Sequence, residues 1–201
     1  MLADIMETHA DIPAVGKIHA PVNRRDVLKI GLAGFLAGTV PFLSHKAHAQ
    51  DFSSWRIAFR HAHTGESFSG VYRVGDRYLP EAFERMNYVL RDFRTGESFP
   101  MDPHVLDIVS IIQAKTGRNQ PLDVLSGYRS PKTNNMLRHV STGVASNSFH
   151  MYGQAMDIRM EGFKTGKLHV LAKTLHAGGV GYYPRSDFIH VDTGKVRYWQ
   201  L

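Results

Sequence analysis

Two histidines and one aspartate carry the chemistry that this sequence suggests first. His150 and Asp157 stand seven residues apart, and His190 follows on a short apolar run. The small residues Gly153 and Ala155 lie between the first two. Two imidazoles and one carboxylate suit a catalytic zinc, because three protein ligands leave the fourth tetrahedral position open for water. The same set accepts iron or manganese, so these residues predict a metal site without fixing the metal.

The apolar run from Phe188 to Thr193 predicts a strand whose side chains alternate between two faces. Ile189 and Val191 then face one side. His190 and Asp192 face the other side, and we expect Asp192 to orient a ligand histidine through a hydrogen bond. On local sequence alone, the competing interpretation of His190 is a structural histidine, because short motifs produce false matches.

Longer tracts around these residues resemble a known family. The pattern S-x-H-x-x-G-x-A-x-D at 148–157 is preceded by SGYR at 126–129 and followed by D-x-x-H at 187–190. This arrangement resembles the zinc D-Ala-D-Ala peptidases, which share a fold with lysostaphin-type endopeptidases and the hedgehog signalling domain. Within that group, the tracts SGYRSPKTN, GGVGYYP and FIHVDTG are similar to the MepK subgroup of murein endopeptidases. The resemblance runs from about His61 to the C-terminus.

The resemblance implies roles for individual residues. It makes His150, Asp157 and His190 the ligands of one Zn²⁺ ion. Asp187 would be the catalytic base, since it stands three residues before a ligand histidine, as the acidic catalytic residue does in these peptidases. It would take a proton from the zinc-activated water as that water attacks an amide carbonyl.

Asp187 can reach the metal only from a turn. Residues three apart in a regular strand point to opposite faces, so Asp187 must precede the strand that carries His190. Pro184 and Ser186 favour such a turn. Asp192 is the rival base because it shares the face of His190, but we assign Asp192 to the orienting role.

Arg129 and Ser148 are the expected substrate contacts. Arg129 follows a short buried strand, and a fixed guanidinium can hold a carboxylate or a developing oxyanion through paired hydrogen bonds. Outside the SGYR context it would be an ordinary surface arginine. Ser148 matches the serine that precedes the first ligand histidine in the family motif. Four nearby tyrosines suit either cleft lining or packing, namely Tyr128, Tyr152, Tyr182 and Tyr183.

The remaining sequence predicts an α+β domain that positions these residues. The first expected helix begins near Pro80 and stops at Gly96, with Phe93 on its apolar face. The other expected elements are a hairpin at 55–60 and 67–74, helices at 102–117, 130–139 and 168–176, strands at 121–126 and 154–160, and two C-terminal strands. This order predicts a mostly antiparallel central sheet flanked by helices, as in the hedgehog and D,D-peptidase fold.

Residues 1–49 are predicted to form a separate leader. Residues 23–29 carry a twin-arginine pattern, followed by an apolar stretch at 30–43 and a small-residue site that ends at Ala49. We predict cleavage after Ala49, which leaves residues 50–201 as a zinc peptidase domain. The alternative is an uncleaved membrane anchor. The apolar stretch, interrupted by glycines and a proline, is shorter than the roughly 20 residues that span a bilayer.

Composition excludes several classes of protein. A chain of 201 residues with 43% hydrophobic content can bury one core. Cysteine is absent, so disulfides are excluded and any metal must be held by His, Asp or Glu. The net charge of +6 favours polyanionic partners, and peptidoglycan stems with free carboxylates qualify. The sequence contains no basic stripe with interleaved aromatics, the pattern typical of nucleic-acid binding. It also contains no G-x-S-x-G turn, which would indicate a serine nucleophile.

These features predict an exported, zinc-dependent peptidoglycan endopeptidase. We expect a monomer in the periplasm or cell-wall space, exported by the twin-arginine route, with no integral membrane segment after cleavage. One alternative is a carboxypeptidase that trims a terminal D-alanine and binds its free carboxylate with Arg129. Another is a catalytically silent, zinc-holding module that binds the wall and regulates other hydrolases. Asp187 argues against the silent module, which needs no base.

Overall fold

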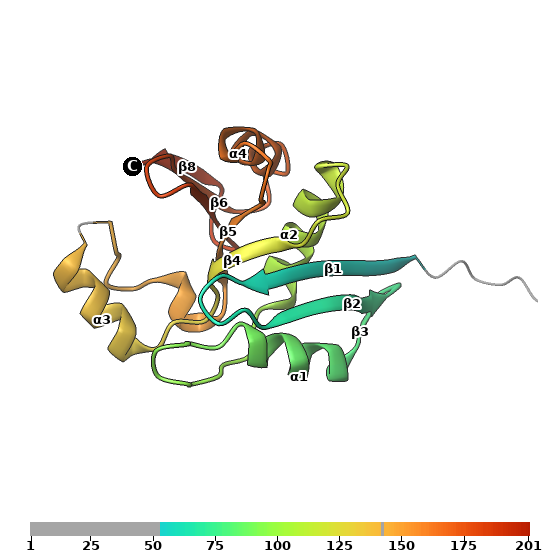
Figure 1. Ribbon diagram of the computed structural model, residues 1–201, viewed down its shortest axis with the longest axis horizontal. Helices are drawn as coiled ribbons and strands as arrows, with labels where there is room; N and C mark the ends of the chain where they lie inside the picture. The colour runs from blue at the N-terminus through green and yellow to red at the C-terminus, as the bar shows by residue number, and fades with distance from the viewer. Residues whose placement is uncertain (1–52, 142) are drawn as a thin grey trace, which may run out of the picture. The chain divides into compact units, whose positions relative to one another are not determined.

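A computed structural model describes residues 53–141 and 143–201 of the chain. The predicted leader and its cleavage site at Ala49 lie outside the described residues and stay predictions. Within the described part, four α-helices and one 3₁₀ helix accompany an eight-stranded sheet (Figure 1). No helix in this part is long and apolar enough to cross a membrane.

The sheet is mixed and has the strand order β3-β2-β1-β4-β5-β7-β6-β8. Its strands are β1 (Ser54–His61), β2 (Ser67–Val74), β3 (Arg77–Tyr78), β4 (Leu122–Ser126), β5 (Ala155–Arg159), β6 (Gly179–Tyr183), β7 (Phe188–Asp192) and β8 (Arg197–Gln200). The β1–β4 and β6–β8 pairs are parallel, and the other five neighbouring pairs are antiparallel.

The α+β class is therefore confirmed, and most strand pairs are antiparallel as predicted, but the sheet is mixed and the predicted number of C-terminal strands was wrong. The chain crosses over through α1 (Pro80–Val89) and α2 (Pro103–Lys115) between β1 and β4, and such a crossover permits the parallel pairing of those strands. The C-terminal region contributes three strands where two were expected, because β8 adds to the outer side of β6.

The helices are α1 (Pro80–Val89), α2 (Pro103–Lys115), α3 (Pro131–Val140) and α4 (Thr165–Lys173). The first three begin with proline, whose missing N–H costs nothing at that position. Asp102 caps α2 by accepting a hydrogen bond from the backbone of His104, and Ser130 caps α3 in the same way through Thr133. Helix α4 begins three residues earlier than its predicted start at 168.

Helix α1 is shorter than its apolar pattern predicts. It ends at Val89, and Phe93 lies in the following loop, where its ring stacks on His63 with centroids 4.3 Å apart. The cause is Asp92, which is 2% exposed. Its carboxylate accepts hydrogen bonds from the backbone of Arg94 and from the backbone and hydroxyl of Ser130. These bonds hold the chain in a turn and end the helix.

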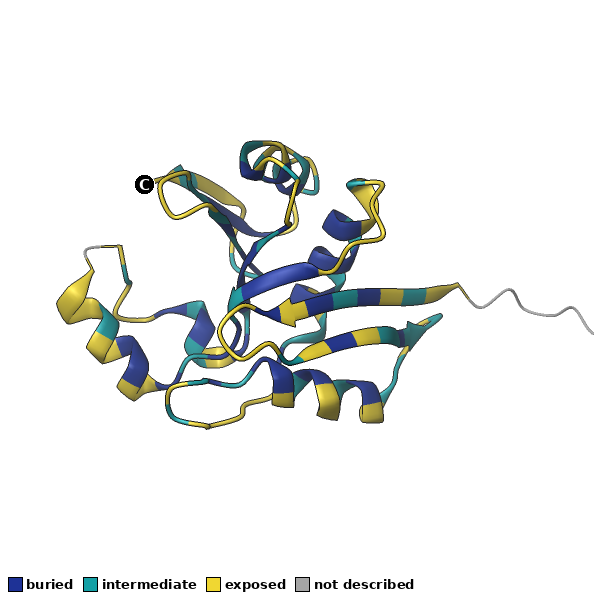
Figure 2. Cartoon of the chain, in the orientation of Figure 1, coloured by how far each residue is buried: buried dark blue, intermediate teal, exposed yellow. Residues whose placement is uncertain are grey.

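The hydrophobic core lies between helices α1, α2 and α4 and one face of the sheet, where the buried residues concentrate (Figure 2). Ile189 and Val191 of β7 belong to this core and are fully buried, together with Leu168 of α4. Alternation along β7 places His190 on the opposite face, as the sequence predicts. The helix-covered face thus stabilises the domain and leaves the other face of β5 and β7 for polar side chains.

Candidate metal centre

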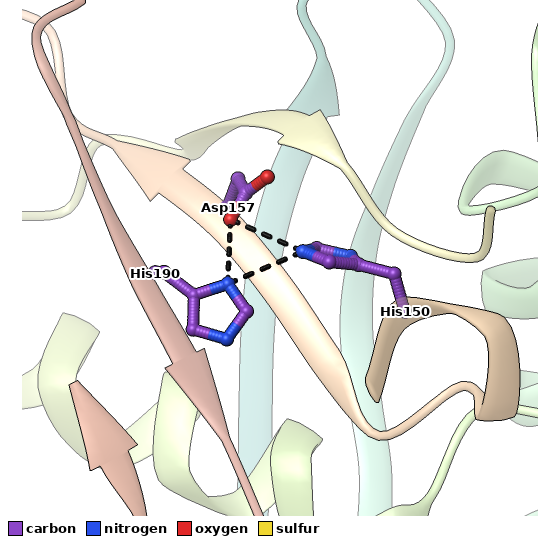
Figure 3. Close-up of side chains that lie close together, drawn as sticks. All are labelled: His150, Asp157 and His190. Atoms are coloured by element: carbon purple, nitrogen blue, oxygen red, sulfur yellow. Dashed lines mark hydrogen bonds and ion pairs between the residues drawn. The ribbon is translucent and has the colours of Figure 1, made fainter. Parts of the chain in front are cut away.

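Three side chains from separate elements converge on the polar face of the sheet (Figure 3). His150 comes from the 3₁₀ helix η2 (Phe149–Tyr152), Asp157 from β5 and His190 from β7. Nδ1 of His190 lies 2.9 Å from Oδ1 of Asp157, and Nε2 of His150 lies 3.2 Å from each of these two atoms. A tetrahedral zinc with bonds of about 2.0 Å sets its ligand atoms about 3.3 Å apart. The three groups therefore fit a small metal ion.

Sheet register explains how two of these side chains meet. Asp157 and His190 are directly opposite partners in the antiparallel β5–β7 pair, and Ala155 is opposite Asp192. Opposite partners in such a pair project from the same face at close range. The small Ala155 side chain therefore leaves the space beside Asp157 open, as the sequence predicts.

A glycine brings the third side chain into place. Gly153 ends η2 in the left-handed region with φ of 66°. A Cβ atom at this position would lie 2.3 Å from the carbonyl oxygen of Pro100. Only glycine fits this close approach, which seats η2 and its His150 against the sheet.

Hydrogen bonds select the ring nitrogen that each histidine presents. Nδ1 of His150 lies 2.8 Å from the carbonyl oxygen of Gly127, and Nε2 of His190 lies 2.9 Å from Oδ2 of Asp192. Both partners only accept hydrogen bonds here, so both ring nitrogens donate. Each neutral imidazole then presents its remaining lone pair to the same point. This arrangement is the one that orients metal-binding histidines in proteins.

The charges around the centre favour a cation. Burial raises the pKa of Asp157, but His150 and His190 outweigh this effect and hold that pKa well below its ordinary value. Burial lowers the pKa of His190, but its hydrogen bonds with Asp157 and Asp192 outweigh burial and raise the pKa to about 9. Burial lowers the pKa of His150. The two carboxylates therefore favour positive charge at His190, supplied by a proton or, with both imidazoles neutral, by a bound metal ion.

Asp192 is a fully buried carboxylate that is well supplied with donors. Besides His190, it accepts hydrogen bonds from the backbone N–H groups of Gly179 and Gly194 at 3.2 and 2.8 Å. Arg197 donates to its two oxygens at 3.0 and 2.7 Å. Burial raises the pKa of Asp192, but His190 and Arg197 lower it further than burial raises it. The carboxylate thus stays ionised and fixed beside His190, where the sequence places an orienting group.

Arg129 and Ser148 line the same cleft as the three candidate ligands, a hollow of about 320 Å³. One terminal nitrogen of Arg129 lies 3.5 Å from Oδ2 of Asp157 and 3.3 Å from the Ser126 hydroxyl. Its Nε atom is buried and has no hydrogen-bond partner among the described residues. Burial lowers the pKa of Arg129. A guanidinium with few and long hydrogen bonds retains donors for an incoming ligand.

Asp187 lies on the turn before β7, with φ of 51°, as the base assignment requires. Its carboxylate accepts a hydrogen bond from the hydroxyl of Thr165, the first residue of α4. Ser186 and Phe188, its chain neighbours, line the cleft, whereas Asp187 is not among the cleft-lining residues of the described chain. The structure therefore brings Asp187 to the correct turn but not into contact with the three candidate ligands, and its role as base stays a prediction.

Two cleft residues on β8 were missed by the sequence analysis. Strand β8 runs parallel to β6, with Arg197 paired to Gly179 and Trp199 paired to Gly181. Cβ atoms at these two glycines would lie 2.4 Å from the Arg197 guanidinium and 2.5 Å from the Trp199 ring, respectively. The glycines thus let both β8 side chains cross β6. The available signal was G-x-G at 179–181 matched by R-x-W at 197–199.

Comparisons with known proteins identify the family of this chain. A family model described as "Peptidoglycan L,D-endopeptidase MepK" matches residues 50–199. The chain is 38% identical over 180 residues to the peptidoglycan L,D-endopeptidase MepK of Escherichia coli (strain K12), which covers 88% of this chain and 97% of that protein. It is 43% identical over 145 residues to the probable peptidoglycan L,D-endopeptidase MepK of Haemophilus influenzae, covering 72% of this chain and 78% of that protein. The matched range contains every residue of the candidate metal centre.

Proposed function

This chain belongs to the MepK family of peptidoglycan L,D-endopeptidases, and we propose that it hydrolyses L,D peptide cross-links in peptidoglycan with one bound Zn²⁺. The family resemblance stated from the sequence is confirmed. The observation that carries the proposal for zinc is the triangle of ligand atoms from His150, Asp157 and His190, with both imidazoles oriented by acceptors behind them.

His150, Asp157 and His190 would hold the ion. Zinc bound by two imidazoles and one carboxylate lowers the pKa of a coordinated water and polarises a carbonyl oxygen. The surrounding chain supports this chemistry by keeping both histidines in the ligand tautomer. The same donor set accepts iron or manganese, so metal content has to be measured together with activity.

Arg129 and Ser148 would hold the substrate. The Arg129 guanidinium lies beside Asp157 in the cleft and retains hydrogen-bond donors. It can bind a stem-peptide carboxylate or the oxygen of the scissile carbonyl as negative charge develops there. Ser148 lines the cleft directly before η2, the helix that carries His150.

Asp187 would accept the proton of the attacking water. For this role its carboxylate must leave Thr165 and turn toward the cleft that its neighbours Ser186 and Phe188 line. Asp187 is exposed, so its side chain is not enclosed in the core. Hydrogen bonds of a catalytic base often tighten only when substrate is present.

We also propose export to the periplasm or cell-wall space by the twin-arginine route, with cleavage after Ala49. The peptidoglycan substrate proposed above lies in that compartment. N-terminal sequencing of the protein from the cell envelope would test the cleavage site. Recovery of the full-length chain in the membrane fraction would contradict it.

Digestion of purified peptidoglycan tests the proposed activity. Residues 50–201 of the wild type and of His190→Ala would be incubated with the substrate, with and without chelator, and the fragments separated by liquid chromatography and mass spectrometry. Loss of cross-linked dimers that requires both metal and His190 supports the endopeptidase. Release of single D-alanine residues from intact dimers indicates the carboxypeptidase instead. The exposed His104→Ala is the control for loss of a histidine.

A further inference from the structure

Tyr183 lies in the cleft wall beside the candidate metal centre. It is the last residue of β6 and lines the cleft together with Arg129, Asp157 and His190. Along β6 it follows Gly179 and Gly181 on the same face, because alternate residues of a strand share a face. That face carries His190, which pairs with Gly181 across the β6–β7 ladder. The phenol therefore projects on the side of the sheet where the proposed chemistry occurs.

The hydrogen bond to Trp199 leaves the Tyr183 proton available. The indole nitrogen Nε1 of Trp199 lies 3.1 Å from the Tyr183 hydroxyl oxygen. An indole N–H can only donate, so the phenol oxygen is the acceptor and its own proton points elsewhere. Among the described residues, that hydroxyl donates to no protein group. A cleft-lining O–H group without a protein acceptor can donate to a substrate.

The phenol ring is also held in one orientation. Its ring stacks on Phe188, with centroids 4.4 Å apart and planes 12° apart. Trp199, which anchors the hydroxyl, is packed across Gly181 against His190. Burial raises the pKa of Tyr183, so the hydroxyl keeps its proton at neutral pH. The group is thus a neutral, fixed donor, the kind that stabilises charge developing in a transition state.

We infer that Tyr183 is a further catalytic residue, whose hydroxyl donates a hydrogen bond to the oxygen of the scissile carbonyl as that oxygen becomes negatively charged. The proton remains on Tyr183 throughout, so no acid or base is consumed. Trp199 is a positioning residue that acts through Tyr183. This inference rests on the proposed amide hydrolysis.

Kinetics of Tyr183→Phe on a defined L,D-cross-linked muropeptide dimer test the inference. The variant keeps the ring and its stacking on Phe188 but lacks the donor. Its kcat should fall on the order of 100-fold while KM changes by less than about threefold. Tyr182→Phe is the matched control, because the neighbouring phenol packs against the core and stacks on His169. It should keep wild-type kcat.

Two readouts other than turnover separate catalysis from structure. Zinc affinity of Tyr183→Phe should equal that of the wild type. A phosphinate analogue of the cross-link, whose charged oxygen stands in for the carbonyl oxygen under attack, should lose affinity by about the same factor as kcat. Trp199→Phe should lower kcat when Tyr183 is present. In the Tyr183→Phe background it should lower kcat little further, because the hydroxyl that Trp199 positions is already absent.

The outcomes distinguish this inference from the proposed function. If the wild type cleaves the dimer and Tyr183→Phe keeps kcat within about threefold of it, the inference is wrong and the proposed function stands. An equal loss of phosphinate and substrate binding would also overturn it, because the hydroxyl would then serve ground-state binding. If the zinc-loaded wild type leaves the dimer intact, both fail together.

Discussion

The indole of Trp199 on β8 lies 5.4 Å from the imidazole of His190 on β7, centroid to centroid, although β6 separates the two strands in the sheet. Gly181 makes this approach feasible, since the position has no side chain where the indole crosses. The C-terminal strand thereby reaches the candidate metal centre over its neighbour. Arg197 and Trp199 are thus part of the cleft wall, and their strand β8 is the edge of the sheet.

Gly181→Ala should therefore disturb the candidate metal centre by displacing Trp199. The added methyl group would lie 2.5 Å from the Trp199 ring, so the indole must move. We expect a loss of about 1–3 kcal/mol in the free energy of unfolding, and a fall of roughly 10- to 100-fold in kcat/KM as the wall shifts. Gly70→Ala in β2 is the control, because its new methyl would meet Phe68 only at 3.5 Å. Equal behaviour of the two variants would show that the crossing is unimportant.

Asp192→Asn should weaken metal binding without creating a cavity in the buried site. The amide is nearly isosteric, but its oxygen is uncharged and its NH₂ group can also face Nε2 of His190, so the tautomer of His190 is no longer fixed. Replacing such a partner typically costs about 10- to 100-fold in metal affinity. Competition with a chromogenic chelator would measure it. Asp123→Asn is the control, a buried carboxylate on β4 that pairs with Arg60. Unchanged zinc affinity in Asp192→Asn would remove the orienting role.

Asp187→Asn should bind zinc with wild-type affinity and lose most turnover, on the order of 100-fold or more. Thr165→Val offers a sharper check, because it releases the Asp187 carboxylate from its hydrogen-bond donor. If Asp187 must leave Thr165 to act, this variant should keep or increase kcat. Full turnover by Asp187→Asn would show that another group accepts the proton, and Asp192 would be considered again.

The family resemblance predicts the candidate ligands, and local sequence adds only the face of the sheet on which each strand residue lies. Alternation along one short strand places His190 and Asp192 on the same face, and the same rule applies to Asp157 on β5. The caps of α2 and α3 could be predicted for a similar reason, since a polar side chain followed by proline marks a helix start within a few residues.

The remaining contacts depend on pairings between distant segments. The contribution of Arg197 and Trp199 follows from parallel pairing of β8 with β6, which no local pattern specifies. The Thr165 contact with Asp187 depends on how α4 packs against the sheet. The early end of α1 depends on the hydrogen bond between Asp92 and Ser130, two segments that meet only in the folded chain.

His61 should make stability depend on pH. It is 1% exposed, and burial lowers its pKa to about 4 from an ordinary value of 6.5. The unfolded chain binds a proton below pH 6.5 that the folded chain binds only below about pH 4. The contribution of His61 to the free energy of unfolding is therefore full above pH 6.5 and is lost as the pH falls to 4, a loss of about 3 kcal/mol.

His61→Asn tests this assignment, because the amide oxygen can still accept the hydrogen bond from the His63 backbone. Urea unfolding at pH 7, 5.5 and 4 should show a smaller loss of unfolding free energy in the variant than in the wild type. The exposed His104→Asn should follow the wild type. Parallel curves for all three proteins would assign the pH dependence to other groups.

The most direct test of the central claim uses two defined substrates and protein of known zinc content. Muropeptide dimers joined by an L,D bond and dimers joined by a D,D bond would each be incubated with protein titrated from zero to one zinc per chain. We predict that monomers form from the L,D-linked dimers in proportion to bound zinc, and that Asp157→Asn, with a weakened ligand set, forms few. L,D-linked dimers that stay intact with the fully zinc-loaded protein would contradict the proposed function.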